Sequence, residues 1–387
     1  MLSAAWPAAW AAEGGKAFAQ AGGLLDFSAD ERRRIARHGP WPTREAGRDP
    51  GNALSGNARA IALGRSLFSD PALSASGRLS CASCHLPSLD FTDGRARAVA
   101  EHPLDRHTPT LWNSGLQRWW GWDGAADSLW SQALRPLLDA REMAIDVATL
   151  SRRLAASRQR VREWRQVFGQ APRVDDVSTL VQTGKALGAY LASLRSPRTA
   201  FDQFRDALLR GDRATASRYP LAAQRGLRLF VGAGRCHLCH AGALFSNGEF
   251  ADIGLPFFSR PGVVDSGRHG GILALRRSSY HLATAWNDDR SGLDVVKTRH
   301  LDLQHRHFGE FKVPSLRQVS RTAPYMHDGQ LATLDDVVRH YDRIDPDRLH
   351  GDGQRILQPL ALSDQDRTDL VAFLDSLSVA VSDAARK

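Results

Sequence analysis

Cysteine and histidine are the residues whose spacing in this chain most directly indicates chemistry. All four cysteines fall in two pentapeptides, CASCH and CHLCH, in which a histidine directly follows a Cys-x-x-Cys pair. This pattern is the attachment signature of c-type haem, because two thiols bond to the vinyl groups of one porphyrin and the next residue brings an imidazole under the iron. The sequence therefore predicts two covalently bound haem c groups. Their attachment and ligand residues are Cys81, Cys84, His85, Cys236, Cys239 and His240.

Two other uses of a Cys-x-x-Cys pair stay open from the pentapeptides alone. A zinc ribbon places its second pair roughly 15–20 residues after the first, much closer than Cys236 is to Cys81. A redox dithiol does not require a histidine after both pairs. Because haem attachment of this kind takes place outside the cytoplasm, we expect a periplasmic protein, although the opening MLSAAWPAAWAA has no basic n-region and is a poor signal peptide as written.

Composition narrows the classes of partner. The chain has 387 residues, and 51 Lys and Arg against 42 Asp and Glu give a formal charge of +9. The arginines are scattered and form no basic run, which favours a solvated basic surface over a nucleic-acid site. No stretch approaches the roughly 18 consecutive apolar residues typical of a membrane span.

Hydrophobic periodicity predicts the elements that must hold the pentapeptides. Residues 177–194 place apolar side chains near one helical face, and Pro197 follows them. Residues 364–377 repeat this pattern after Ser363, which suits an N-cap. Convincing strands are few, so we expect a mainly α fold.

A degenerate internal repeat surrounds the two pentapeptides. Each is preceded by Gly-x-x-Leu-Phe, at residues 64–68 and 226–230. Each is followed further along the chain by a Phe, with a Gly a few residues after it. A repeat of this length predicts two cytochrome c-like haem domains related by a pseudo-repeat. We expect an N-terminal segment at 1–54, a first haem domain at 55–200 and a second at 215–387, with the polar stretch RGDRATASRYP as the linker.

The chain resembles the bacterial dihaem cytochrome c peroxidase/MauG superfamily. The resemblance covers about residues 55–378 and is carried, in order, by CASCHLPSLDFTDGR, HTPTLWN, WDGAADSLWSQALRPLLDAREM, CHLCHAGALFSNGEFADIGLP, FKVPSLR, TAPYMHDGQLATL and VVRHYD. It implies unequal haems. The haem on His85 would react with peroxide at an open sixth position, and the haem on His240 would be six-coordinate and handle electrons.

The resemblance also selects a sixth ligand for the second iron. Methionine fills this place in the peroxidases and tyrosine in MauG, and the matching position here is Tyr341. Leu334, Val337, Val338 and Tyr341 share one helical face, a pattern that an ordinary core tyrosine would also produce. Met326 is the competing ligand. A phenolate favours the higher iron oxidation states, so a His/Tyr haem would help both haems to hold oxidising equivalents.

The distal pocket and the bridge between the haems are assigned by the same resemblance. Glu142 would move the peroxide proton, Gln132 would support it by hydrogen bonds, and Pro136 would shape the pocket. Trp122 would lie between the haems as a stepping stone for an electron hole. Without the resemblance, Glu142 and Gln132 read as surface residues and Trp122 as core packing.

A calcium ion between the haems is a further implication, with Asn113, Thr322 and Pro324 around it; elsewhere these would be plain turn residues. The chain also departs from the family pattern. Ala125 replaces an arginine near the bridge, and Asp105 stands where inactive peroxidases have a histidine that caps the first iron, so we expect an open site. The Arg- and His-rich stretch 256–310 is either a partner-docking loop or an insertion without catalytic consequence.

These features predict a peroxide-dependent oxidoreductase. The leading hypothesis is reduction of hydrogen peroxide with electrons from a small redox protein, a cytochrome c or a cupredoxin. The alternative within this class is MauG-like oxidation of residues in a protein partner. A different class is an electron-transfer cytochrome without catalysis, in which both irons would be six-coordinate. The resemblance also suggests a homodimer.

Overall fold

The computed structural model describes residues 23–43, 49–256, 258–349, 351–352 and 356–381. The opening apolar stretch considered above as a signal peptide lies outside the described residues. Helices dominate the described part of the chain, and the strands are four short ones. The expectation of a mainly α fold is confirmed.

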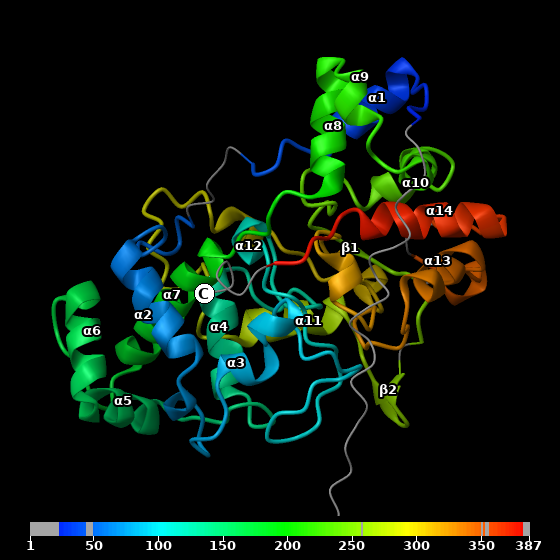
Figure 1. Cartoon of the computed structure of the whole chain (residues 1–387). Coiled ribbons are helices and arrows are strands. Elements are labelled where there is room, and N and C mark those ends of the chain that lie inside the picture. The colour runs from blue at the N-terminus through cyan, green and yellow to red at the C-terminus, as the bar shows by residue number, and fades with distance from the viewer. Residues whose placement is uncertain (1–22, 44–48, 257, 350, 353–355, 382–387) are drawn as a thin grey trace, which may run out of the picture.

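One group of helices encloses the first Cys-x-x-Cys-His motif. Its members are α2 (Ala58–Phe68), α3 (Cys81–Cys84), α4 (Leu129–Leu138), α5 (Val147–Ala156), α6 (Arg158–Phe168) and α7 (Val177–Ser193). Helix α7 packs against both α2 and α4, and twelve of its residues are buried, so it is the central element of this half (Figure 1). It coincides with the helix that the apolar pattern predicts, and it ends before Pro197.

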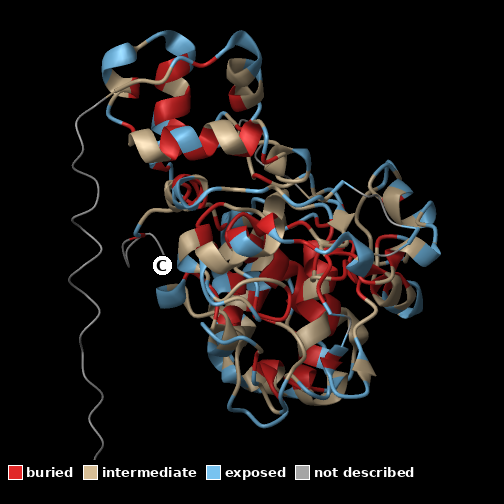
Figure 2. Ribbon diagram, turned by 90° about the vertical axis from the view of Figure 1, so that its right-hand side faces the viewer, coloured by how far each residue is buried: buried red, intermediate tan, exposed pale blue. Residues whose placement is uncertain are grey.

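A second group of helices surrounds the other motif. It comprises α1 (Ala29–Ala36), α8 (Ala200–Arg210), α9 (Arg213–Ala216), α10 (Leu221–Val231), α13 (Leu334–Asp342) and α14 (Asp364–Asp375). Helix α14 begins directly after Ser363, whose side chain forms the expected N-cap, and it packs along α10. Phe27 and Ile35 of the N-terminal segment belong to this second core. Figure 2 shows buried residues inside both groups of helices.

The part of the chain between α10 and α13 carries the other α-helices and the strands. These are α11 (Arg268–Arg277), α12 (Val296–Arg299) and the strands β1 (Phe250–Ala251), β2 (Phe258–Arg260), β3 (Val263–Val264) and β4 (Phe311–Lys312). Strand β1 pairs antiparallel with β4, and β2 pairs antiparallel with β3. Helices α11 and α12 and strand β1 lie between the two helical groups (Figure 1).

The Gly-x-x-Leu-Phe stretches make matching contacts in the two halves. A Cβ atom on Gly64 of α2 would lie 2.0 Å from the carbonyl oxygen of Ala186 on α7. A Cβ atom on Gly226 of α10 would lie 1.9 Å from the carbonyl oxygen of Asp369 on α14. Each glycine therefore allows a close helix crossing that no other residue permits.

A search of the described helices finds none that is long and apolar enough to cross a membrane.

Candidate functional site

The first motif presents a histidine ready to bind a metal. His85 lies just after α3, and its Nδ1 donates a hydrogen bond of 2.9 Å to the carbonyl oxygen of Phe91. Phe91 is fully buried and has a left-handed backbone, with φ of 61°, which turns this carbonyl toward the ring. Burial lowers the pKa of His85, so the imidazole is neutral and Nε2 keeps its lone pair. Metal-binding histidines are commonly oriented by such a bond from the other ring nitrogen.

The second motif repeats this arrangement. His240 donates from Nδ1 to the carbonyl oxygen of Phe245 at 2.9 Å, and Phe245 is also buried, with φ of 54°. Burial likewise lowers the pKa of His240. Both histidines are therefore held with Nε2 available as an iron ligand.

The cysteines suit covalent attachment better than the alternative uses of Cys-x-x-Cys. All four are free thiols, and burial raises the pKa of Cys81 and of Cys236 to about 12. A redox dithiol needs the opposite, a thiol whose pKa is lowered. Among the described residues there is no group of three or more His, Cys, Asp or Glu side chains that could hold a metal ion, which disfavours zinc.

A large cavity adjoins the second motif. Its volume is about 1350 Å³, above the range of roughly 300–1,000 Å³ usual for small-molecule pockets. Cys236, Cys239 and His240 lie on its wall, and Trp122 of the first half also lines it. Its size, its mainly apolar wall and the attachment residues fit a porphyrin.

Tyr341 lies on the same cavity. It occupies the last turn of α13, on the face that contains the buried Leu334 and Val338. Its hydroxyl makes no hydrogen bond to any other described residue. Burial raises the pKa of Tyr341 well above its usual range, and the two cysteines of the motif raise it further. A phenolate here therefore requires a neighbouring positive charge, such as a ferric iron. The adjacent His340 is bonded to the carbonyl oxygen of Ile253 at 2.7 Å and is not the candidate ligand.

Met326 also lines this cavity, from the turn that follows Pro324. Its backbone is left-handed, with φ of 71°, and its carbonyl accepts a bond from Gly329. Tyr341 lines the same cavity as both cysteines of the motif, which, after burial, contribute to its raised pKa. Both residues thus line the cavity, and Tyr341 as the sixth ligand stays a prediction.

The predicted distal residues belong to α4 and to the loop that follows it. Glu142 follows this helix closely, and burial together with the nearby Asp139 raises the pKa of Glu142 to about 7. The Glu142 carboxylate in turn helps to raise the pKa of both Cys81 and Cys84, which places it beside the first motif. A carboxyl group that titrates near neutral pH suits acid–base work.

Gln132 and Pro136 lie on α4 itself. The Oε1 atom of Gln132 is buried and has no hydrogen-bond partner among the described residues. Such an unsatisfied atom is costly in a folded protein and marks a place where a ligand or water is accommodated. Pro136 interrupts the helix from within, and its carbonyl accepts the amide of Met143, which turns the chain back toward α4.

Trp122 is held firmly between the two halves. Its Nε1 donates to the carbonyl oxygen of His107 at 2.9 Å, and its own carbonyl accepts the amide of Lys312 at 2.8 Å. His107 donates from Nδ1 to the carbonyl oxygen of Arg95 at 2.7 Å. Trp122 thus joins a loop of the first half to strand β4.

Sequence reasoning missed the charged residues around this bridge. Asp123 pairs with Arg106 at 2.7 Å, and although burial alone would raise the pKa of Asp123, Arg106 brings it down to about 2. Arg268 of α11 lies between the rings of Trp119 and Phe250 and donates to the carbonyl oxygen of Gly124 at 2.7 Å. Burial lowers the pKa of Arg268 to about 10.

Lys312 is a second buried cation on the wall of the large cavity. Its Nζ donates to the carbonyl oxygen of Trp119, and burial lowers its pKa to about 8. Asp123 and Lys312 were present in the WDG and FKVPSLR stretches, so the motifs contained a signal for them. Arg268 had no such signal. Its position shows that part of the 256–310 stretch is packed against the bridge loop.

The predicted calcium residues are partly engaged already. The side-chain amide of Asn113 donates to Ser196 Oγ, and its oxygen accepts the Ser196 amide hydrogen, both at 2.9 Å. Thr322 and Pro324 line the large cavity. Only neutral oxygens are offered by these three residues, and one lone pair of the Asn113 oxygen remains for a cation.

The position at which a histidine would cap the first iron is occupied by ion pairs. Asp105 pairs with Arg141 at 2.7 Å and with Arg260 at 3.6 Å. His102 is exposed, and His107 is buried with its Nδ1 bonded to the backbone. No histidine occupies this position, and an open first site stays a prediction.

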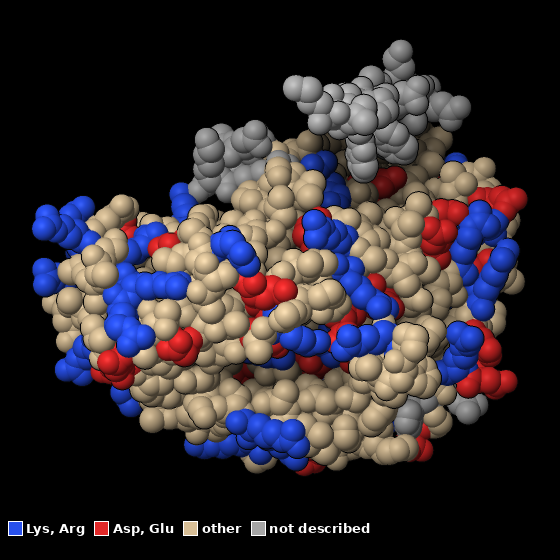
Figure 3. Space-filling view, turned by 90° about the horizontal axis from the view of Figure 1, so that it is seen from below, with Lys and Arg blue, Asp and Glu red and all other residues tan. Residues whose placement is uncertain are grey.

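The outer surface is basic overall but mixed. In the view of Figure 3, Lys and Arg side chains are interspersed with Asp and Glu and form no continuous field. This is the distribution expected of a solvated surface rather than a nucleic-acid interface.

Comparisons with known proteins show which family this chain resembles over most of its length. Residues 58–213 match the family model described as di-haem cytochrome c peroxidase. The chain is 33% identical over 338 residues to cytochrome-c peroxidase IdrP2 of Denitromonas iodatirespirans, covering 84% of this chain and 83% of that protein. It is also 33% identical over 319 residues to the methylamine utilization protein MauG of Methylorubrum extorquens, covering 82% and 77%.

Solved structures share the fold. The diheme peroxidase BthA from Burkholderia thailandensis superimposes with a TM-score of 0.66 at 24% identity, covering 84% of this chain and 87% of that chain. A MauG-like protein associated with microbial copper homeostasis gives the same TM-score over 90% of this chain. On the identity and coverage of its relatives, this chain belongs to the dihaem cytochrome c peroxidase/MauG family and is an oxidoreductase.

Proposed function

We propose that this protein is a periplasmic dihaem c-type peroxidase that reduces hydrogen peroxide. One haem c would be attached through Cys81 and Cys84 with His85 as the proximal ligand. The other would be attached through Cys236 and Cys239 with His240 as the ligand. The periplasmic location is proposed because this type of attachment takes place outside the cytoplasm.

The observation that carries the proposal is the inequality of the two sites. The proximal sides are nearly the same, since each histidine donates from Nδ1 to the carbonyl of a buried phenylalanine at 2.9 Å. The other residues differ. Glu142, with a pKa raised to about 7 by burial, lies near the first motif, whereas the unpartnered hydroxyl of Tyr341 faces the cavity of the second. One site is thus equipped to move a proton and the other to close a coordination position.

The chain's own residues would carry the proton steps. Glu142 in its carboxylate form would take the proton from the near oxygen of the incoming peroxide and return it to the far oxygen, which leaves as water. Gln132 Oε1, buried and unpaired, would accept a hydrogen bond from the bound peroxide and orient it. The haem supplies the electrons for O–O cleavage when it is bound. Two electrons from a small donor protein, a cytochrome c or a cupredoxin, and two protons complete the reduction to two waters.

Trp122 would serve the electron path. It is anchored at both its indole nitrogen and its backbone carbonyl. It belongs to the first half but lines the large cavity beside the second motif. Fixed in this way, the indole keeps a constant position for an electron hole that passes between the sites.

A second candidate function is MauG-like oxidation of residues in a protein partner. Tyr341 favours it, because a phenolate ligand lowers the reduction potential and helps the second site to hold an oxidising equivalent. In that case the ferric protein would react with peroxide without prior reduction, with a high-valent state shared by both haems. A plain electron-transfer cytochrome remains disfavoured, because Glu142 and Gln132 would then have no role.

We also propose that the two haem domains derive from one unit, at 55–200 and 215–387. The matching glycine crossings at Gly64 and Gly226 and the matching phenylalanine carbonyls support this pseudo-repeat. A calcium ion at Asn113, Thr322 and Pro324 and a homodimer are retained as proposals. Calcium removal by a chelator should change the ferric spectrum if the ion is present.

The test of the main proposal is the electron paramagnetic resonance spectrum of the fully ferric protein, followed by a peroxide titration. We expect one high-spin component from the His85 site and one low-spin component from the His240 site. Two low-spin components would contradict the open first site and the catalytic assignment. A spectral change on peroxide addition without any reductant would favour the MauG-like function, and a requirement for one electron first would favour the peroxidase.

A further inference from the structure

The loops behind the two proximal histidines are both held by one short segment of the chain. This segment, residues 315–321, follows strand β4 and contains the one-turn helix Val319–Arg321. One part of it contacts the loop after His240, and the other part contacts the loop after His85.

Its first part fixes the second proximal loop. Ser315 Oγ donates to the carbonyl oxygen of Leu244 at 2.7 Å, and Arg317 Nε donates to that of Ala243 at 2.6 Å. These two carbonyls directly precede Phe245, whose carbonyl receives the His240 bond. The loop that orients His240 is therefore held at two consecutive residues.

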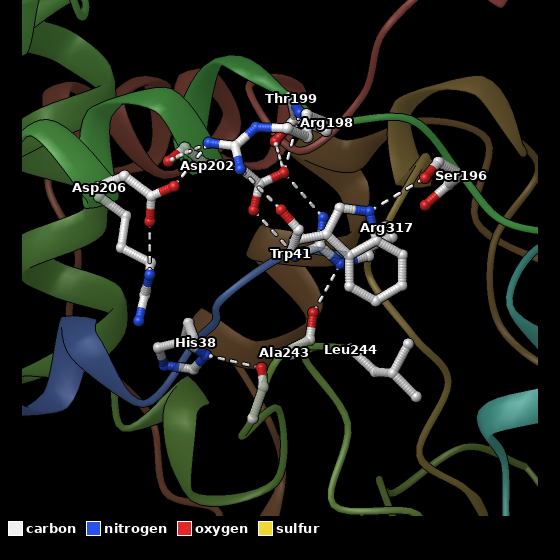
Figure 4. A network of polar contacts seen from close by, with 12 residues as sticks. His38, Trp41, Ser196, Arg198, Thr199, Asp202, Asp206, Ala243, Leu244 and Arg317 are labelled. Atoms are coloured by element: carbon white, nitrogen blue, oxygen red, sulfur yellow. Dashed lines mark hydrogen bonds and ion pairs between the residues drawn. The ribbon is translucent and has the colours of Figure 1, made fainter. Parts of the chain in front are cut away.

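Arg317 is itself fixed from several sides. It is 1% exposed, and it donates to both carboxylate oxygens of Asp202 at 3.0 Å. Its guanidinium carbon lies 3.8 Å from the ring centroid of Trp41, as part of the network in Figure 4. The His38 ring stacks on the Phe245 ring, with the two centroids 4.6 Å apart. A bidentate, buried arginine of this kind has little freedom to move.

The last part of the segment fixes the first proximal loop. Asp90 is fully buried and directly precedes Phe91, whose carbonyl receives the His85 bond. Its carboxylate accepts a bond from Arg321 Nε at 2.6 Å and one from Gln318 Nε2 at 3.4 Å, a residue 228 positions away in sequence. Trp112 Nε1 adds a third bond at 3.0 Å.

The segment is anchored independently of both loops. The backbone amide of Gln318 donates to the carbonyl oxygen of Leu377, and its side-chain amide exchanges two bonds of 2.9 Å with the backbone of Val379. Gln318 has a left-handed backbone, with φ of 65°, and is fully buried. A displacement at this residue would be passed to both proximal loops.

We propose that residues 315–321 form a shared brace that positions both proximal histidines. Arg317 is the positioning residue for His240, and Gln318 and Arg321 are the positioning residues for His85. The inference rests on the proposed function, because it assigns an effect on two haems that the two motifs would hold.

The test uses the complete haem-loaded protein, five variants and one control variant. The reduction potential of each haem is measured by spectroelectrochemistry, and the ferric g values by electron paramagnetic resonance. Arg321→Gln should lower the potential of the His85 haem, since the Asp90 charge is then less compensated and favours ferric iron. Asp90→Asn should raise it. Arg317→Lys should change the g values of the His240 haem alone.

The decisive variant is Gln318→Asn, which tolerates the left-handed backbone but is too short to keep the bonds to Asp90 and Val379. It should change the g values of both haems. If it changes one haem or neither, the shared brace is wrong. Arg321→Lys keeps the charge and should restore the wild-type potential of the His85 haem, which a merely structural role would not require.

Arg225→Gln is the matched control. Arg225 also makes two bonds to a buried carboxylate, that of Asp369, but neither residue touches a proximal loop. The spectra and potentials of Arg225→Gln should equal those of the wild type. A change in them would show that the effects of the other variants come from general destabilisation. A pyridine haemochrome assay, which counts the haems c per chain, distinguishes a failure of the proposed function from a failure of the brace. Fewer than two haems c per wild-type chain would contradict the proposed function, whereas two haems with unaltered variant spectra would contradict the brace alone.

Discussion

Replacement of Glu142 by glutamine tests the proton chemistry of the first site. Burial and the neighbouring Asp139 raise the pKa of Glu142 to about 7, so at pH 7 about half of the molecules carry the carboxylate and at pH 5 only about 1% do. The carboxylate is the form that accepts the peroxide proton. We therefore expect the second-order rate with peroxide to rise with pH and to level off above neutrality.

The Glu142→Gln variant keeps the size of the side chain but cannot accept the proton. Its rate should fall by about 10²- to 10⁴-fold at pH 8, the usual contribution of a general base, and should lose the inflection near pH 7. Stopped-flow absorbance of the haem after mixing with peroxide measures this rate between pH 5 and 9. Glu101→Gln serves as the control, because the Glu101 carboxylate lies nearby but is bonded to Ser76 and Arg78.

Asp139→Asn supplies a second, directional check. The Asp139 carboxylate is one cause of the raised pKa of Glu142, so its neutralisation should move the inflection to lower pH while the plateau rate is retained. A wild-type rate that is independent of pH between 5 and 9, or a Glu142→Gln variant as fast as the wild type, would refute the assignment of Glu142 as the base.

The same raised pKa has a consequence for stability. The native protein holds the Glu142 proton more tightly than the unfolded chain does, whose pKa is near 4.5. This contribution to stability is therefore fully present below pH 4.5 and is lost as the pH rises through about 7. Between pH 5 and pH 8 the wild type should therefore lose more stability than Glu142→Gln does. Thermal melts of the two proteins at both pH values measure this difference.

Three further predictions concern the second site, the bridge and the helix crossing. Tyr341→Phe removes a hydroxyl that forms no hydrogen bond with any described residue, so the fold should persist while the low-spin signal of the second site is lost and its reduction potential rises. Tyr219→Phe, which loses the bond to Ser376, should leave both unaltered. Trp122→Phe should slow electron exchange between the sites without changing the rate of the first peroxide reaction, and stopped-flow spectroscopy measures both rates. Gly226→Ala places a Cβ atom against the Asp369 carbonyl and should lower the free energy of unfolding by roughly 1–3 kcal/mol, measured by denaturant titration.

The elements around the motifs were largely predictable from the sequence. Helix α7 coincides with the apolar pattern at 177–194, and the Ser363 cap begins α14 as expected. Tyr341 lies on the α13 face that its spacing from Leu334 indicates. These predictions succeed because helical periodicity reports directly which face is buried, and because capping is decided by neighbouring residues.

The charged contacts were not predictable in the same way. Arg268 contacts Gly124, and Arg321 contacts Asp90, across more than a hundred positions of sequence. The sequence does not distinguish a buried arginine from an exposed one. Only the tertiary fold decides which carbonyl or carboxylate an arginine contacts. The N-terminal segment gave no hint either that Phe27 and Ile35 join the second core, since a short apolar stretch carries no information about its partner.

The local chemistry of the two pentapeptides cannot explain why one site would react with peroxide and the other would not. Each motif contributes the same pair of thiols and an imidazole oriented by the same kind of backbone bond. We attribute the difference to residues that are far from either motif in sequence, since Glu142 follows α4 and Tyr341 lies in the last turn of α13. A change of one residue on such a helix alters the reactivity of a site without any change to haem attachment. Under the proposed roles, two chains with the same pentapeptides could differ between peroxide reduction and protein oxidation, and position 341 is where this chain would bear on that difference.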